Sequence, residues 1–276
     1  MKNAINWFER RVASGEIPTG GHYQAKEFLE TIVWRRIELV LSNAGVLVLV
    51  TFIQVLLAMA NCRSQSQEEE AAYPVMAPLN QYLIEDKASE IALARSAAPP
   101  SISDRAEVMV LEPTGYTIAV KGTNGFVCIV ERSWTVPTDN PEFWNPKVRA
   151  PICYNAQAAR TYLPFDLMKT ELVLAGKSKM EIARAIASAF DKKELLALEP
   201  GAMCYMMSKN QYLNDEGKRW HPHLMFYLPG EVAGNWGANL PGSPILAAYD
   251  RQVEATVFMV WVGKWSDGTP APPVLH

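Results

Sequence analysis

The sequence of 276 residues lacks the motifs that mark many catalytic sites. It contains no G-x-S-x-G nucleophile elbow and no S-x-x-K motif, which excludes two familiar arrangements of a catalytic serine. Its four cysteines form no C-x-x-C pair. Gly176-Lys177-Ser178 is not the end of a phosphate-binding loop, because Glu171 stands where that motif requires its first glycine. The motifs considered therefore point to no particular class of enzyme.

An excess of charge of one sign is also missing. The chain has 26 Lys and Arg against 29 Asp and Glu, which gives a formal net charge of −3 and a pI of about 5.9. A protein without a positive excess has no general attraction to phosphate backbones, and we therefore expect no nucleic-acid partner. The composition, 49% hydrophobic and 20% charged, is typical of a globular protein.

One long segment, Leu39 to Ala60, carries no charge at all. About 20 apolar residues are needed to cross the hydrocarbon core of a bilayer, and the small residues at the end of this segment also fit a signal-peptide cleavage site. We therefore predict that residues 37–60 are a signal peptide or a transmembrane anchor. An arginine pair before the segment and an acidic run after it orient the chain with its N-terminus inside. The chain from Asn61 onward is then exported.

The segments on either side of this apolar stretch differ in character. Residues 1–36 are an N-terminal extension with two competing explanations, a cytoplasmic segment before an anchor or a start codon placed too far upstream. Residues 61–78 are polar and acidic and end near a proline, which is typical of a linker. Residues 79–276 are long enough for one exported domain with a sizeable core.

The exported domain is predicted to have an α+β fold. Apolar periodicity and turn residues predict, in order, helix 79–97, strands 106–111, 116–121 and 126–134, helices 164–174 and 178–190, and strands 202–208, 224–228 and 255–263. This order favours a mainly antiparallel sheet with the helices on one face. Asn124-Gly125 lies between two apolar runs and predicts a hairpin within a meander of the first three strands.

Two of the four cysteines are predicted to form a disulfide, Cys128 and Cys153. Both follow the apolar segment, so an exported chain permits their oxidation. Cys128 lies in the third predicted strand and Cys153 in the next extended piece, which the proline-rich loop between them brings back alongside. Cys204 is a rival partner for either, whereas Cys62 lies in the linker.

The sequence Trp220-His221-Pro222-His223 contains the sharpest candidate for a metal site. In an extended segment, residues i and i+2 share a face, so both imidazoles can meet one Zn²⁺ or Cu²⁺ ion. Nothing in the spacing selects the further ligands. The alternative is a pair of histidines at the edge of a loop, one of them stacked on Trp220.

Aromatic residues near the C-terminal loops are candidates for ligand contact. Trp220 adjoins the two histidines, and Trp236 lies among glycines and prolines where no core layer is evident. Both are predicted to contact a ligand, because binding sites combine aromatic side chains with a few polar groups.

The stretch from Leu172 to Ile186, LVLAGKSKMEIARAI, resembles the first half of bacterial helix-turn-helix regulators. The resemblance covers only this stretch and implies a basic recognition helix after it. The residues that follow, Ser188 to Leu198, carry acidic as well as basic side chains. The same residues also predict a plain αα-hairpin, closed by Gly176 and capped by Ser178.

These patterns together predict an exported or membrane-tethered bacterial-type envelope domain that binds a small molecule or a protein partner. It would lie in the periplasm or outside the cell, and would contact the membrane through residues 39–60 if that segment is not cleaved. The alternatives are a metal-binding protein or metalloenzyme centred on His221 and His223, with Zn or Cu, and a helix-turn-helix-like regulator.

Overall fold

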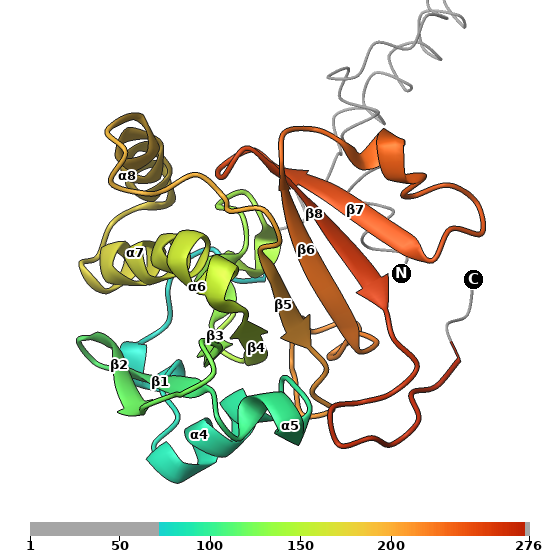
Figure 1. The fold of residues 1–276 in the computed structure, drawn as a ribbon. Coiled ribbons are helices and arrows are strands. Elements are labelled where there is room, and N and C mark those ends of the chain that lie inside the picture. Colours follow the sequence, from blue (N-terminus) through green and yellow to red (C-terminus); the bar gives the residue numbers. More distant parts are fainter. Residues whose placement is uncertain (1–71, 274–276) are drawn as a thin grey trace, which may run out of the picture. The chain divides into compact units, whose positions relative to one another are not determined.

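The computed structural model describes residues 72–273, which build an eight-stranded sheet with helices packed against it (Figure 1). The extension 1–36 and the predicted signal or anchor segment 37–60 lie outside the described residues. Within 72–273, none of the helices has the length and apolar character required to cross a membrane. The α-helices are α4 (Lys87–Arg95), α5 (Pro100–Ser103), α6 (Ala156–Thr161), α7 (Leu163–Leu174) and α8 (Lys179–Asp191).

The strands follow the order β2-β1-β3-β4-β5-β6-β8-β7 across the sheet. They are β1 (Glu107–Glu112), β2 (Gly115–Val120), β3 (Val127–Glu131), β4 (Ala150–Tyr154), β5 (Met203–Met206), β6 (His223–Pro229), β7 (Ile245–Asp250) and β8 (Ala255–Trp261). Every neighbouring pair except β1 and β3 is antiparallel. The predicted α+β class and mainly antiparallel sheet are thus confirmed.

All six predicted strands are present, and the extended piece with Cys153 forms β4, but β7 was not predicted. Its sequence, ILAAYD, contains two alanines, which have weak strand propensity, and follows a loop rich in glycine and proline. β7 forms because it pairs with β8 along six residues, from Ile245 opposite Val260 to Asp250 opposite Ala255. This pairing is a tertiary constraint that local composition does not reveal.

The predicted meander of three strands is wrong, because β3 pairs with β1 in parallel instead of forming a hairpin with β2. Asn124 does not serve a hairpin turn. Its side chain donates to the carbonyl of Ile102 (2.7 Å) and accepts from the backbone N–H of Phe126 (3.1 Å). Gly122 lies so close to the backbone of Glu107 that a Cβ would meet its nitrogen at 2.1 Å. The glycine therefore lets the chain cross the start of β1 and enter β3 on its other side.

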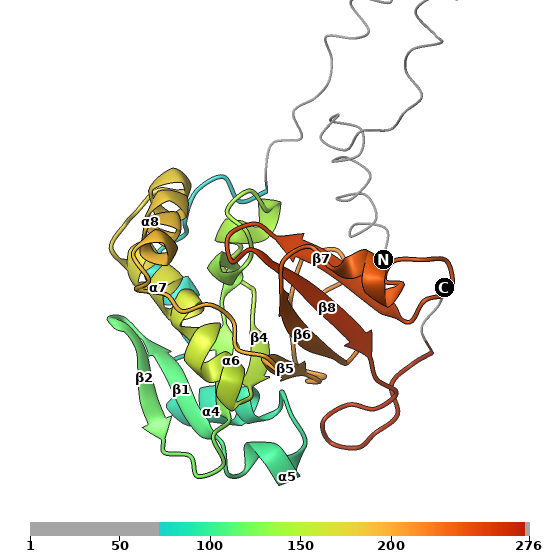
Figure 2. The ribbon, with the colours of Figure 1, turned by 45° about the horizontal axis from the view of Figure 1, so that its top comes forward.

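Helices cover both faces of the sheet, not one face as the sequence predicted (Figures 1 and 2). α4 packs on β1, β3 and β4 from one side, where Cys128 and Val130 are buried with it. α6, α7 and α8 lie on the opposite side, over Ile129 and Ile152. A strand such as β3, which is buried on both faces, needs a covering layer on each.

The first predicted helix begins later than expected, and the predicted linker is partly folded. Asp86 caps α4 by accepting from the N–H groups of Ala88 (3.2 Å) and Ser89 (3.0 Å), so residues 79–86 precede the α-helix. Tyr73, Met76 and Ala77 pack against the core, although they belong to the predicted linker 61–78. The folded domain therefore begins before residue 79.

The predicted αα-hairpin is confirmed in α7 and α8. Gly176 ends the first helix with a φ of +72°, a left-handed conformation that glycine adopts without strain. Ser178 accepts from the N–H of Glu181 (3.3 Å), and the Glu181 carboxylate accepts from the N–H of Ser178 (2.9 Å). This is the predicted capping box. In the described chain, no helix follows α8 before β5.

The structure brings the sulfur atoms of Cys128 and Cys153 to disulfide distance, as predicted. The two residues lie directly opposite each other on the antiparallel strands β3 and β4, on the face covered by α4. Cys204 lies in the core on the other face and is a free thiol, 3.1 Å from the hydroxyl of Tyr227. The sheet itself therefore separates Cys204 from the other two.

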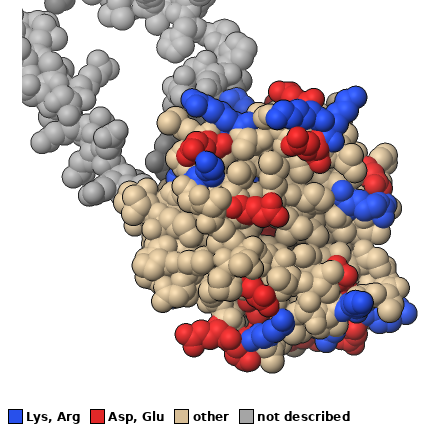
Figure 3. Space-filling view, turned by 90° about the vertical axis from the view of Figure 1, so that its left-hand side faces the viewer, with Lys and Arg blue, Asp and Glu red and all other residues tan. Residues whose placement is uncertain are grey.

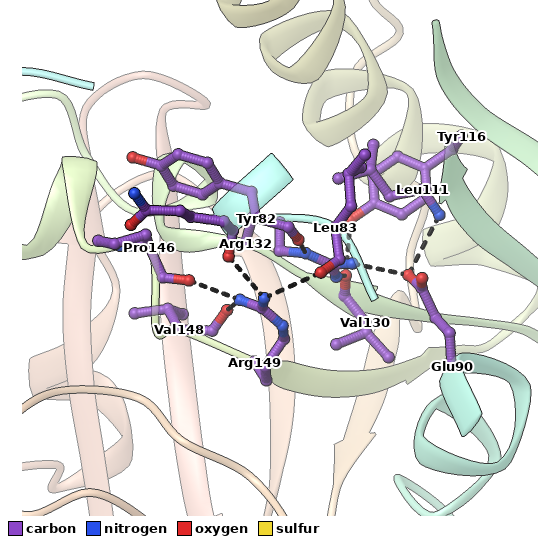
Figure 4. A network of polar contacts seen from close by, with 11 residues as sticks. Tyr82, Leu83, Glu90, Leu111, Tyr116, Val130, Arg132, Pro146, Val148 and Arg149 are labelled. Carbon is purple, nitrogen blue, oxygen red and sulfur yellow. Dashed lines mark hydrogen bonds and ion pairs between the residues drawn. The ribbon is translucent and has the colours of Figure 1, made fainter. Parts of the chain in front are cut away.

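A buried ion pair ties α4 to the sheet (Figure 4). The guanidinium of Arg132, which follows β3, lies 2.8 Å from the carboxylate of Glu90, and the two side chains are 0% and 1% exposed. Arg132 also donates to the carbonyl of Tyr82 (2.6 Å), while Glu90 accepts from the N–H of Leu111 (3.1 Å). One pair of charges thus joins α4, β1 and the segment before α4.

We predict that Arg132→Met lowers the free energy of unfolding by about 3–5 kcal/mol, because it leaves the Glu90 carboxylate buried without a partner. Lys87→Met is the matched control, because it breaks the exposed ion pair with Glu112 (3.2 Å) and should cost less than about 1 kcal/mol. Urea unfolding followed by circular dichroism measures both. Equal costs for the two variants would contradict the role given to the buried pair.

Candidate functional site

Five rings meet where β6 begins and β8 ends, and we call them the Trp220 cluster: Trp220, His221, His223, Trp261 and Trp265. In the sheet, His223 lies opposite Trp261 on one side and Met206 on the other. The ring centroid of Trp261 is 5.8 Å from that of His221 and 5.4 Å from that of His223. Trp220 approaches Trp261 at 6.2 Å and His223 at 5.9 Å. Three predicted site residues therefore converge on one indole.

The loop between β5 and β6 positions these rings. The side chain of Gln211 donates to the carbonyl of Trp220 (2.9 Å), and the N–H of Val262 donates to the carbonyl of Pro222 (3.0 Å). The guanidinium carbon of Arg219 lies 5.7 Å from the ring centre of Trp265, within the range of a cation–π contact. The cluster is thus held by backbone contacts and carries one cation at its margin.

Both histidines of the cluster favour the neutral form. His223 is buried, its Nδ1 lies 2.8 Å from the carbonyl of His221, and burial lowers its pKa to about 4. Burial also lowers the pKa of His221. Neutral imidazoles suit metal binding, but residues 72–273 contain no group of three side chains arranged to hold a metal ion. Binding of Zn²⁺ or Cu²⁺ by this pair stays a prediction.

The structure does not bring Trp236 to this cluster. Trp236 ends a short 3₁₀ helix (Ala233–Trp236), and its ring packs on Phe258 with centroids 4.9 Å apart. Phe258 and Trp261 are three residues apart on β8, so they point to opposite faces of the sheet. The Trp236 side chain is nevertheless 51% exposed. It remains available for contact, but not with the same ligand as Trp220.

A second group of polar residues was missed by the sequence analysis. Glu131, Tyr154, Asp166 and Lys169 are buried together between the sheet and α7, and we call them the buried polar cluster. A signal was present, because Asp166, Lys169, Thr170 and Val173 have the i, i+3, i+4, i+7 spacing of an inward-facing helical stripe. Polar residues on such a stripe indicate a buried network.

Burial dominates the electrostatics of this cluster. It raises the pKa of Glu131 to about 7 and that of Asp166 well above its ordinary value. It also lowers the pKa of Lys169 to about 8. Groups with perturbed pKa values in close contact are candidates for proton binding or transfer. The cluster lies on the same face of the sheet as His223.

We predict that acid weakens the fold partly through His223. The pKa of His223 in the folded state, about 4, lies below the ordinary value of 6.5. The neutral form therefore contributes stability that is present above about pH 6.5 and is lost as the pH falls toward about 4. His223→Gln should flatten this part of the curve of melting temperature against pH. The same curve for wild type and variant would contradict the burial of a neutral imidazole.

Charge gives little further indication of a partner. On the face shown in Figure 3, Lys and Arg are interspersed with Asp and Glu, and a broad part of the surface carries neither. This face therefore offers no single-sign patch of the kind that marks nucleic-acid binding. Comparison with protein-family models, with curated proteins and with solved structures finds no match for this chain.

Proposed function

We propose that the chain from Asn61 onward is an exported domain, membrane-tethered or released, that binds a small molecule at the Trp220 cluster. The observation that carries this proposal is the convergence of three indoles and two imidazoles at one end of the sheet. Trp220, His221 and Trp261 in this group are partly exposed. Aromatic rings with a few polar groups are the usual lining of sites for small molecules.

The side chains favour a ligand with a flat ring and an acidic or polar substituent. Indole faces provide apolar area for stacking. The cation of Arg219 beside Trp265 can pair with a carboxylate or another acceptor at the edge of the cluster. Neutral His221 can exchange a hydrogen bond with the ligand without adding charge.

The test is a fluorescence titration of the purified exported region with indole-3-acetate and benzoate as flat acids and with glucose as a neutral ring. We expect a saturable change with a flat acid. Trp261→Ala should weaken it at least about tenfold, as truncation of a central aromatic contact does. Trp236→Ala is the control on the opposite face and should bind as wild type. Loss of binding in Trp236→Ala with retention in Trp261→Ala would contradict the assignment.

Export rests on two independent features, the uncharged segment from Leu39 to Ala60 and the cysteine pair at disulfide distance. Disulfides persist in oxidising compartments and are rare in the cytosol of mesophiles. The loop between Cys128 and Cys153 spans 25 residues and includes the proline-rich segment after β3. A bond that closes it restricts the unfolded chain.

We predict that protein isolated from cells contains the Cys128–Cys153 bond and a free Cys204. Reduction should lower the free energy of unfolding by about 3 kcal/mol, the value for closing a loop of this length. Peptide mapping without reductant identifies the pair. Cys128→Ser, in which no such bond can form, is the control whose stability should not respond to reductant. Free thiols at both positions in native protein would contradict export.

A further inference from the structure

The eight-stranded sheet is open, and it ends in two edge strands, β2 and β7. An edge strand presents backbone N–H and C=O groups on its outer side, and these can pair with a strand of another molecule. The register of β2 with β1 shifts between Val108 and Met109, which leaves Ala119 without a residue opposite it. A bulge of this kind twists an edge away from a regular partner. β7 shows no such shift along its pairs with β8, so its edge is protected in another way.

The side chain of Asn239 bonds to the outer edge of β7. Its amide nitrogen donates to the carbonyl of Ala247 (2.8 Å), and its amide oxygen accepts from the N–H of Ala247 (3.0 Å). The backbone N–H of Asn239 donates to the carbonyl of Ile245 (3.0 Å). A side-chain amide carries the same kinds of donor and acceptor as a peptide group. Asn239 therefore binds Ala247 as a residue of a ninth strand would.

The local sequence explains why Asn239 reaches this edge. The four residues that follow it, Leu-Pro-Gly-Ser, form a tight turn, in which the N–H of the serine donates to the carbonyl of the leucine (2.9 Å). Proline suits the second position of such a turn, and Gly242, with a φ of +78°, suits the third. The turn reverses the chain beside the start of β7. Asn239 itself has a φ of +63°, which asparagine adopts more readily than most residues.

The outer edge of β7 is complementary to itself. Backbone groups alternate in direction along a strand, so the outward-facing residues are Ile245, Ala247 and Tyr249. Asn239 occupies both groups of Ala247 and one of Ile245, and within residues 72–273 the outward groups of Tyr249 have no partner. In an antiparallel pairing of two β7 strands centred on Ala247, Ile245 of each copy lies opposite Tyr249 of the other. A two-fold axis would then pair every outward group.

We propose that Asn239 closes β7 against strand pairing with a second copy of this chain. The loop between β6 and β7 also carries Trp236 and Leu240, whose side chains are 51% and 61% exposed. Exposed apolar area beside an open edge favours association. Loss of the side-chain amide frees Ala247 and leaves one backbone bond between residue 239 and the strand. This inference concerns self-association and does not depend on ligand binding.

The test is sedimentation velocity of the full chain over a wide range of concentration. Asn239→Gly removes the side-chain amide and keeps a residue that adopts a positive φ without strain. We expect its dimer association constant to exceed that of the wild type at least about tenfold, because two hydrogen bonds no longer oppose opening of the edge. Asn235→Gly is the matched control in the same loop. Its exposed side chain makes no hydrogen bond within the described chain, so this variant should associate as the wild type does.

A second substitution shows whether the association uses β7. Tyr249→Pro removes an outward N–H and no bond to β8, which an edge strand tolerates. Added to Asn239→Gly, it should restore the association of the wild type. An Asn239→Gly chain that associates no more than the wild type overturns the proposal. Association that Tyr249→Pro does not reduce, or that Asn235→Gly matches, also overturns it.

Amide exchange of the wild type, resolved by nuclear magnetic resonance, needs no variant to fold. The N–H groups of Ala247 and Tyr249 both point outward, but only that of Ala247 is bonded by Asn239. After correction for intrinsic rates, the amide of Ala247 should exchange at least about tenfold more slowly than that of Tyr249. Equal exchange would overturn the closure of the edge by Asn239. No ligand is used, so failure here is distinguishable from failure of the binding proposal.

Discussion

The buried pair of Glu90 and Arg132 is the interaction on which most of the described domain depends. Each charge is almost completely removed from water, and each has partners from other segments of the chain. Such a pair adds little stability compared with an apolar replacement, but it is very costly to break. It therefore specifies which elements meet: α4 above the disulfide face, β1 beside β3, and Tyr82 over the end of β3. A shift of any one of these elements would leave a buried charge without its partner.

The same constraint explains why the central strands differ from the outer ones. β3 and β4 are buried on both faces, so their apolar residues support α4 on one side and α6 and α7 on the other. Where a polar side chain falls in this double layer, it must find a partner within the protein. Arg132 finds Glu90, and Glu131 finds Tyr154 and Asp166 across the sheet. The two adjacent residues thus anchor the layers on opposite faces.

Features that depend only on residues close together in the sequence could be predicted from it. The capping box at Ser178 and the turn at Gly176 depend on neighbouring residues only, and both were predictable. The pairing of Cys128 with Cys153 was predictable because the loop between them brings the chain back alongside β3 as the neighbouring strand β4. The Asn124-Gly125 hairpin failed because Asn124 bonds to Ile102, a residue distant in sequence. The buried polar cluster was missed because its members come from β3, β4 and α7, and only the polar stripe on α7 gives a local signal.

The Trp220 cluster and the buried polar cluster lie on the same face of the sheet but on different elements. His223 and Trp261 belong to β6 and β8, whereas the members of the buried polar cluster belong to β3, β4 and α7. His223 and Tyr227 point the same way on β6, and their separation of four residues corresponds to about 13 Å along the strand. β6 is paired with β8 along seven residues, from His223 opposite Trp261 to Pro229 opposite Ala255. The path between the two groups runs through packed rings, because Tyr227 stacks on Tyr162 with centroids 4.0 Å apart and Tyr162 lies 6.1 Å from Tyr154.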